Sequence, residues 1–141
     1  EDAWSAADAL ARYLDSAAPP HLVTVSSDGG GCLPVFDAQG NVVRYGVGAS
    51  RALAETLATL LARGQPLERV LPAFTANVAD TLRLPGKGRL AVGMDADLVL
   101  LDDAGRPRDV MARGVWHVRG GEPVRRGTFE GGDSPTDDGA D

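Results

Sequence analysis

The chain has 141 residues, enough for one ordinary domain but too few for an eight-stranded α/β barrel, which needs about 250 residues. Hydrophobic residues make up 43% and charged residues 24%, a composition typical of a globular protein rather than a disordered one. The net charge of −6 comes mostly from residues 130–141, which hold five acidic and no basic residues and leave 15 acids against 14 bases elsewhere. We expect residues 131–141 to form a disordered acidic tail whose charge says nothing about a substrate.

Several partner classes are disfavoured by composition. The arginines are scattered and form no basic run, so we expect no nucleic-acid partner. We find no signal peptide and no apolar stretch long enough to cross a bilayer, so we expect no membrane partner. The single cysteine, Cys32, excludes an internal disulfide and suits the reducing cytosol, which predicts a cytoplasmic protein. Because the chain starts at Glu1 without a methionine, we expect that it was cut from something longer.

The first half of the chain alternates between helical and extended patterns. Apolar residues at helical spacing predict a helix over 5–14. The apolar, β-branched run 22–27 predicts a buried strand that ends at Asp28. Two short extended segments, 33–36 and 42–45, flank a tight turn that is rich in turn-forming residues.

Two further helices are expected next. Ser50 is a candidate N-cap for an amphipathic helix over 52–61 that ends at Gly64. A second helix has Pro66 in its first turn and continues to about residue 84.

The sequence pattern changes after residue 86, where turn-forming residues separate short apolar runs. We expect strands over 98–101, 110–118 and 123–129, with a hairpin turn at 119–122. The chain therefore reads as helix, strand, helix, helix and then a small antiparallel sheet, which is an α/β fold.

Asp28 is the leading candidate for chemistry. A carboxylate at the carboxyl end of a buried parallel strand can hold a metal and move the proton of its bound water. The alternative is structural, because Asp-Gly is a common turn pair in which the carboxylate accepts hydrogen bonds from nearby backbone amides. Local chemistry alone favours the turn.

Other residues offer weaker signals. The glycines at 29–31 are followed by no Lys-Ser/Thr pair, so they predict a flexible loop rather than a phosphate cradle. A nucleophilic role for Cys32 needs a histidine nearby, but His21 and His117 are predicted to lie elsewhere, and a zinc site from this chain alone is equally disfavoured. We expect Asn77 to cap the second helix or brace it against a neighbouring loop.

Several segments together resemble a known group of enzymes. Ser27-Asp28 at a strand end, with 75–79, 86–90 and 93–102, resembles the exit from the barrel into the β-sandwich lobe of the metal-dependent amidohydrolase superfamily. The runs 26–41 and 121–130 are similar to the isoaspartyl dipeptidase family of that superfamily. The likeness extends over about residues 3–130 and corresponds to the carboxyl-terminal third of such an enzyme.

The resemblance implies a fold and an activity. Residues 1–85 would be the last strand and helices of a metallo-dependent hydrolase (β/α)8 barrel, and residues 86–130 part of a small β-sandwich lobe, incomplete alone. The family members are zinc peptidases with two metal ions that hydrolyse β-aspartyl dipeptides, and we expect a homo-oligomer when the enzyme is complete. Two alternatives stay open: another amidohydrolase activity, such as a dihydroorotase-like enzyme or an N-acyl amino acid deacylase, and a non-catalytic truncated paralogue.

The resemblance also implies residue roles. Asp28 stands where the family's aspartate binds one metal, takes the proton of the bridging hydroxide and delivers it to the leaving amine. Cys32 stands where the family commonly has a serine that contacts substrate, and a thiol is a weaker hydrogen-bonding group. The family's His-x-His pair, carboxylated lysine and two later histidines would lie upstream of Glu1, so we expect the isolated chain to be inactive.

Overall fold

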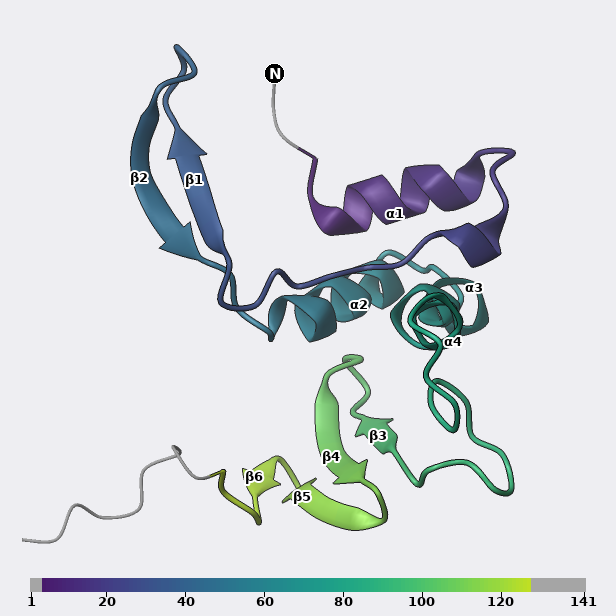
Figure 1. Cartoon of the computed structure of the whole chain (residues 1–141). Coiled ribbons are helices and arrows are strands. Elements are labelled where there is room, and N and C mark those ends of the chain that lie inside the picture. The colour runs from purple at the N-terminus through teal and green to yellow at the C-terminus, as the bar shows by residue number, and fades with distance from the viewer. Residues whose placement is uncertain (1–3, 128–141) are drawn as a thin grey trace, which may run out of the picture.

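The computed structural model describes residues 4–127 of the chain (Figure 1). The predicted acidic tail lies outside the described residues. The helical elements are α1 (Ala6–Asp15), η1 (Pro20–Leu22), α2 (Ala52–Ala62), α3 (Leu67–Val70), η2 (Leu71–Phe74) and α4 (Ala76–Thr81), where η marks a 3₁₀ turn. The strands are β1 (Cys32–Phe36), β2 (Val42–Val47), β3 (Leu98–Leu101), β4 (Pro107–Ala112), β5 (Val115–Arg119) and β6 (Glu122–Pro123). No helix in residues 4–127 is long and apolar enough to span a bilayer.

The predicted first helix is confirmed, and a capping box fixes its start. The Ser5 hydroxyl accepts the Asp8 N–H, and the Asp8 carboxylate accepts the Ser5 N–H, each at 3.2 Å. Such a cap is worth about 1 kcal/mol, because it satisfies N–H groups that the helix itself leaves unpaired. The helix buries Ala7 and Leu10 against the core.

The second helix, α2, is confirmed over Ala52–Ala62, but the predicted N-cap is wrong. Ser50 lies one residue too early. The Arg51 carbonyl accepts the N–H of Glu55 at 3.0 Å, so Arg51 is the N-cap, and its side chain makes no capping bond. The predicted end is correct, because Gly64 takes the left-handed φ of +79° that terminates the helix.

The single helix expected from Pro66 to residue 84 is wrong. The segment divides into α3, η2 and α4. Pro72 cannot donate the backbone hydrogen bond that a continuous helix needs, and Thr75 has φ −131° and ψ −86°, outside the helical region. The apolar spacing is helical throughout, but of the residues that carry it only Val70 is fully buried, whereas Leu67 and Leu82 are exposed.

The main core lies among these helices. Leu60 of α2 and Val70 of α3 are completely buried, and they cluster with Ala7, Leu10, Leu57 and Ala73. Partly buried residues from other parts of the chain pack against the cluster, among them Val23, Val25 and Leu101. The core therefore joins the helices to residues 23–25 and to β3.

The predicted strand over 22–27 is not part of any sheet. Leu22 belongs to η1, and residues 23–28 have no strand partner among residues 4–127. Their burial alternates, with Val23 and Val25 partly buried and Thr24 and Ser26 exposed, as expected for extended chain with one face on a core. A strand is defined by its ladder of hydrogen bonds, and here one bond is formed, from the Val25 N–H to the Ala73 carbonyl at 3.0 Å.

The predicted hairpin is confirmed as β1–β2, which pair antiparallel and project away from the helices (Figure 1). The Asp37 carboxylate accepts backbone N–H groups of Gln39 and Asn41 at 2.9 and 2.8 Å, which closes the turn. The hairpin exposes a set of large apolar side chains: Leu33, Phe36, Val42, Val43, Tyr45 and Val47.

The antiparallel sheet after residue 97 has the order β3-β4-β5-β6. The strand predicted over 98–101 is confirmed as β3, whereas the one over 110–118 is two strands, because Arg113 and Gly114 both have positive φ and reverse the chain. The predicted turn at 119–122 is confirmed, but the last strand has two residues, Glu122–Pro123, instead of running to 129, of which 128 and 129 lie outside the described residues. The described residues therefore form an α/β chain, and its division into barrel and lobe stays a prediction.

Candidate functional site

Asp28 is the first residue of a tight turn. Its carbonyl oxygen accepts the N–H of Gly31 at 2.9 Å, and Gly30 has φ +83°. Asp28 itself has φ +47°, in the left-handed region where non-glycine residues are uncommon, although aspartate tolerates it better than most. Strained backbone of this kind costs of order 1 kcal/mol and persists only where the surroundings enforce it.

The Asp28 carboxylate lies over its own turn and is solvent-exposed. It sits so close to Gly31 that a Cβ added there would collide with it. Within residues 4–127, no backbone or side-chain group donates a hydrogen bond to this carboxylate. The turn is held instead by backbone groups and by Ser26 and Ser27, whose hydroxyls accept the N–H groups of Asp28 and Gly29 at 3.3 and 3.2 Å. Both carboxylate oxygens are therefore available to a ligand.

Gly48 is hydrogen-bonded to the turn through both of its backbone groups. The Gly48 carbonyl accepts the Gly30 N–H, and the Gly48 N–H donates to the Gly31 carbonyl, both at 2.9 Å. Gly48 is buried, and a Cβ on it would collide with the Asp28 carbonyl. Of the glycines at 29–31, Gly30 supplies the positive φ of the turn and has open space where a Cβ would stand, whereas a Cβ on Gly31 would meet the Asp28 carboxylate. An open hollow beside the turn is lined by Gly29, Gly30, Gly48, Ala49, Ser50 and Arg51.

The predicted bracing role of Asn77 is confirmed. Its side chain is 6% exposed, and its Nδ2 donates to the carbonyl oxygens of Pro20 at 2.8 Å and Val23 at 2.9 Å. The amide thus attaches α4 to the segment that leads to Asp28.

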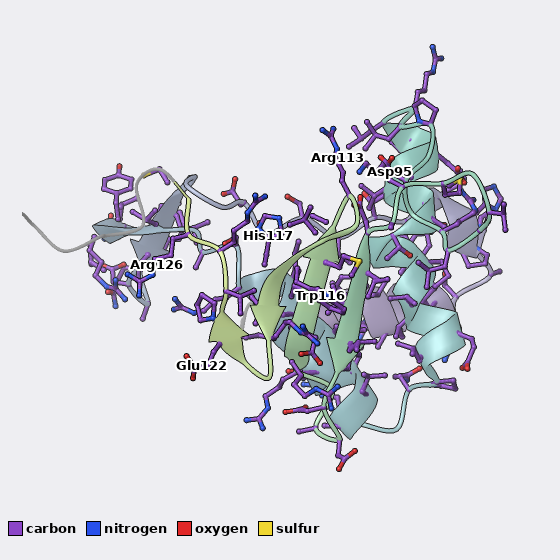
Figure 2. All side chains as sticks on the ribbon, turned by 90° about the horizontal axis from the view of Figure 1, so that it is seen from below. Asp95, Arg113, Trp116, His117, Glu122 and Arg126 are labelled. Atoms are coloured by element: carbon purple, nitrogen blue, oxygen red, sulfur yellow. The ribbon has the colours of Figure 1, made fainter. Side chains whose placement is uncertain are left out.

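The other candidate residues are distributed over different elements. Cys32 opens β1, is exposed and lies across from Val47 in the hairpin. His21 is in η1, and His117 is in β5 of the four-stranded sheet (Figure 2). Within residues 4–127, no three His, Cys, Asp or Glu side chains come together as a metal site. Asp28 therefore belongs to no such group of three in the described part of the chain.

Sequence reasoning missed an ionic cluster that joins the loop after α4 to the sheet. Lys87 Nζ lies 2.7 Å from Asp95 and also pairs with Asp97, whose carboxylate accepts the Arg113 N–H at 2.6 Å. Figure 2 shows Asp95 and Arg113 at the same end of the sheet. The hydrogen bond from Lys87 is the main reason why the pKa of Asp97 is lowered, and Asp95 likewise raises the pKa of Lys87. We infer a structural role, which the sequence pattern did not indicate.

Asp109 is a second carboxylate that the sequence did not single out. It is 8% exposed and accepts hydrogen bonds from the Gly120 N–H and from Arg108 Nε, both at 2.6 Å. The Gly120 bond is the first cause of its lowered pKa. Asp109 therefore fixes the turn between β5 and β6, and no sequence motif pointed to it.

Comparison with known proteins places these features in a wider setting. The profile of the Amidohydrolase family matches residues 5–117. One similar solved structure is the β-aspartyl dipeptidase of the thermophilic, keratin-degrading Fervidobacterium islandicum AW-1 in complex with a β-Asp-Leu dipeptide. It has a TM-score of 0.75 and 34% identity over 86% of this chain and 32% of that chain.

A second structure of β-aspartyl dipeptidase from the same organism gives a TM-score of 0.71 and 28% identity, over 90% of this chain and 31% of that chain. The chain thus spans about a third of the length of these relatives. The family match covers most of the described residues, so the predicted resemblance is confirmed. The chain belongs to the amidohydrolase family of hydrolases.

Proposed function

We propose that the chain is the carboxyl-terminal part of a zinc-dependent isoaspartyl dipeptidase, an enzyme that hydrolyses β-aspartyl dipeptides. Family membership and 34% identity to a β-aspartyl dipeptidase support this assignment. The observation that carries it is the Asp28 carboxylate, which is exposed and accepts no hydrogen bond from residues 4–127. A carboxylate that only stabilised its own turn would be expected to accept backbone N–H groups, as Asp37 does.

Asp28 suits a metal-binding role. Amidohydrolases are generally metal-dependent, and carboxylate oxygen is one of the ligands that zinc takes in proteins. When bound, two zinc ions would polarise the amide carbonyl and lower the pKa of a water molecule. Asp28 supplies one ligand, and the remaining ligands would come from polypeptide that corresponds to the unmatched two-thirds of the relatives.

Asp28 also has a proton-transfer role in this proposal. Its free oxygens would take the proton of the attacking water and then deliver it to the leaving amine. The turn, closed by Gly48, would fix the backbone from which the carboxylate projects during both transfers.

Cys32 is proposed to contact the dipeptide. It opens β1 four residues after Asp28, and its side chain is exposed. A thiol is a weaker hydrogen-bond partner than the hydroxyl usual in the family, so Cys32→Ser should improve the KM for the dipeptide. We further propose a cytoplasmic location and a homo-oligomer for the complete enzyme, with neither nucleic acid nor membrane as a partner.

The test compares two preparations. The 141-residue chain alone, assayed with β-Asp-Leu and zinc, should show no turnover. The same chain co-expressed with the part of the Fervidobacterium islandicum dipeptidase that the match leaves uncovered should hydrolyse the dipeptide. In that reconstituted enzyme, Asp28→Asn should abolish activity, whereas the control Asp103→Asn, an exposed turn carboxylate, should leave activity unchanged.

Two results would contradict the proposal. One is an Asp28→Asn enzyme with the activity of the unaltered enzyme. The other is hydrolysis of a dihydroorotate or an N-acyl amino acid in preference to β-Asp-Leu in a substrate panel, which would indicate another activity of the same family. A complex that assembles but hydrolyses no member of the panel would indicate a non-catalytic paralogue.

A further inference from the structure

The buried amide of Asn77 connects α4 to backbone that is distant in sequence. Its Nδ2 donates to the carbonyl oxygens of Pro20 and Val23, which lie 57 and 54 residues away along the chain. These two bonds use both N–H groups of the amide. The side chain is 6% exposed, so water cannot readily replace either bond.

A third bond acts on the same stretch of backbone. The Ala73 carbonyl accepts the N–H of Val25 at 3.0 Å. In extended chain, alternate residues direct their backbone groups to opposite edges. Val23 and Val25 therefore present one edge to residues 73–77, while Thr24 and Ser26 present the other. The three bonds together set both the position and the rotation of this segment, which ends at Asp28.

We propose that Asn77 is a positioning residue for Asp28. The carboxylate lies between two anchors: Gly48, which closes the turn after it, and Asn77, which fixes the extended segment before it. Loss of the second anchor leaves residues 20–28 attached mainly through the single Val25 bond and through apolar packing. The catalytic part of this inference rests on the proposed function of Asp28, and there a displacement of 1 Å costs about 10²-fold in rate.

Two substitutions separate positioning from general stability. Asn77→Asp keeps the shape of the side chain but replaces the donating amide with a group that repels the two carbonyls. Thr75→Val is the matched control: it removes a hydroxyl that donates to the Leu71 carbonyl at 2.9 Å, inside the same helical region and away from residues 20–28.

Amide hydrogen–deuterium exchange on the 141-residue chain gives the first readout. We expect Asn77→Asp to accelerate exchange in peptides that cover residues 20–28 by at least about tenfold, chiefly at the Val25 N–H, since the two bonds from the buried Asn77 amide that hold this segment against Ala73 are lost. Exchange in the β1–β2 hairpin and in β3–β5 should stay unchanged, and Thr75→Val should leave residues 20–28 as they are. Unchanged exchange at 20–28, or an equal acceleration throughout the chain, would overturn the proposal. If Asn77→Asp does not fold, Asn77→Ser, which removes the donors without adding charge, decides by the same criterion.

Kinetics of the reconstituted enzyme give the second readout. Asn77→Asp should lower kcat for β-Asp-Leu by about 10²-fold, with KM changed less than twofold, because Asp28 is displaced while the substrate contacts remain. Accelerated exchange with an unchanged kcat would overturn the positioning of Asp28. An active Asp28→Asn enzyme would instead reject the proposed function, and the exchange measurement would still decide whether Asn77 anchors residues 20–28.

Discussion

Gly48 packs against the backbone carbonyl of Asp28 so closely that no side chain fits between them. The contact joins the end of β2 to the turn that carries the candidate catalytic acid, and the Gly48 backbone bonds both Gly30 and Gly31. The hairpin is therefore attached to this turn by its base, and the geometry of Asp28 depends on a residue 20 positions later in the chain.

Gly48→Ala should destabilise the turn. The added methyl would force the Asp28 carbonyl or the base of the hairpin to move, a steric conflict that typically costs about 1–3 kcal/mol. The free energy of unfolding from urea titration measures the effect. The control is Gly46→Ala in β2, where the nearest atom to an added Cβ is 3.6 Å away, an ordinary contact. Equal stability of the two variants would show that the packing at Gly48 is not restrictive.

Leu60 should be the most sensitive position of the core. Leu60→Ala leaves a cavity among α1, α2 and α3 and should lower the free energy of unfolding by about 2–5 kcal/mol. Leu90→Ala removes the same atoms from a side chain that is 74% exposed, and it should change stability by less than about 0.5 kcal/mol. Similar losses of unfolding free energy in the two variants would contradict the placement of Leu60 in the core.

Acid should weaken the attachment of the loop after α4 to the sheet. Lys87 and the Arg113 N–H lower the pKa of Asp97 below its ordinary value of 3.8 in the folded chain. The stabilisation is therefore present above the pKa of the unfolded chain and is lost as pH falls through the lower folded pKa. The urea concentration at the midpoint of unfolding, measured between pH 2 and pH 6, should decrease as the pH is lowered. This decrease should be smaller for Asp97→Asn than for the unaltered chain. Asp103→Asn serves as the exposed control and should keep the original acid dependence, so an identical response of the two variants would argue against the ion pair.

The sequence predicted the elements whose signals are local. The Ser5 helix, the 37–41 turn and the glycine turn at 119–122 each depend on residues within a few positions of one another, and all three are present. The bracing role of Asn77 was also predicted. Its acceptors, the carbonyl oxygens of Pro20 and Val23, could not be predicted, because tertiary packing brings them to the amide.

The helices and strands that were predicted wrongly differ from the structure for physical reasons of two kinds. Pro72 divides a helix whose apolar spacing is otherwise continuous, and the Arg113-Gly114 reversal divides what looked like one strand. Both are local backbone effects that hydrophobic periodicity does not register. The strand expected before Asp28 differs in kind, because a strand requires a partner, and residues 4–127 supply none for it.

The candidate site was proposed from the sequence as a single residue, Asp28, and its role stays a prediction. The contact of Gly48 with this turn could not be predicted, because it joins segments that the sequence pattern does not relate. The Lys87–Asp97 pair and the Asp109 turn contact were missed for the same reason.

The most direct test of the account is anomalous diffraction at the zinc edge on crystals of the reconstituted complex. We predict a zinc peak about 2.0–2.2 Å from a carboxylate oxygen of Asp28, the normal range for a carboxylate ligand. Asp28→Asn should weaken or remove that peak. Zinc bound elsewhere in the complex, with Asp28 directed into solvent and hydrolysis intact, would contradict the claim that this carboxylate belongs to the metal centre.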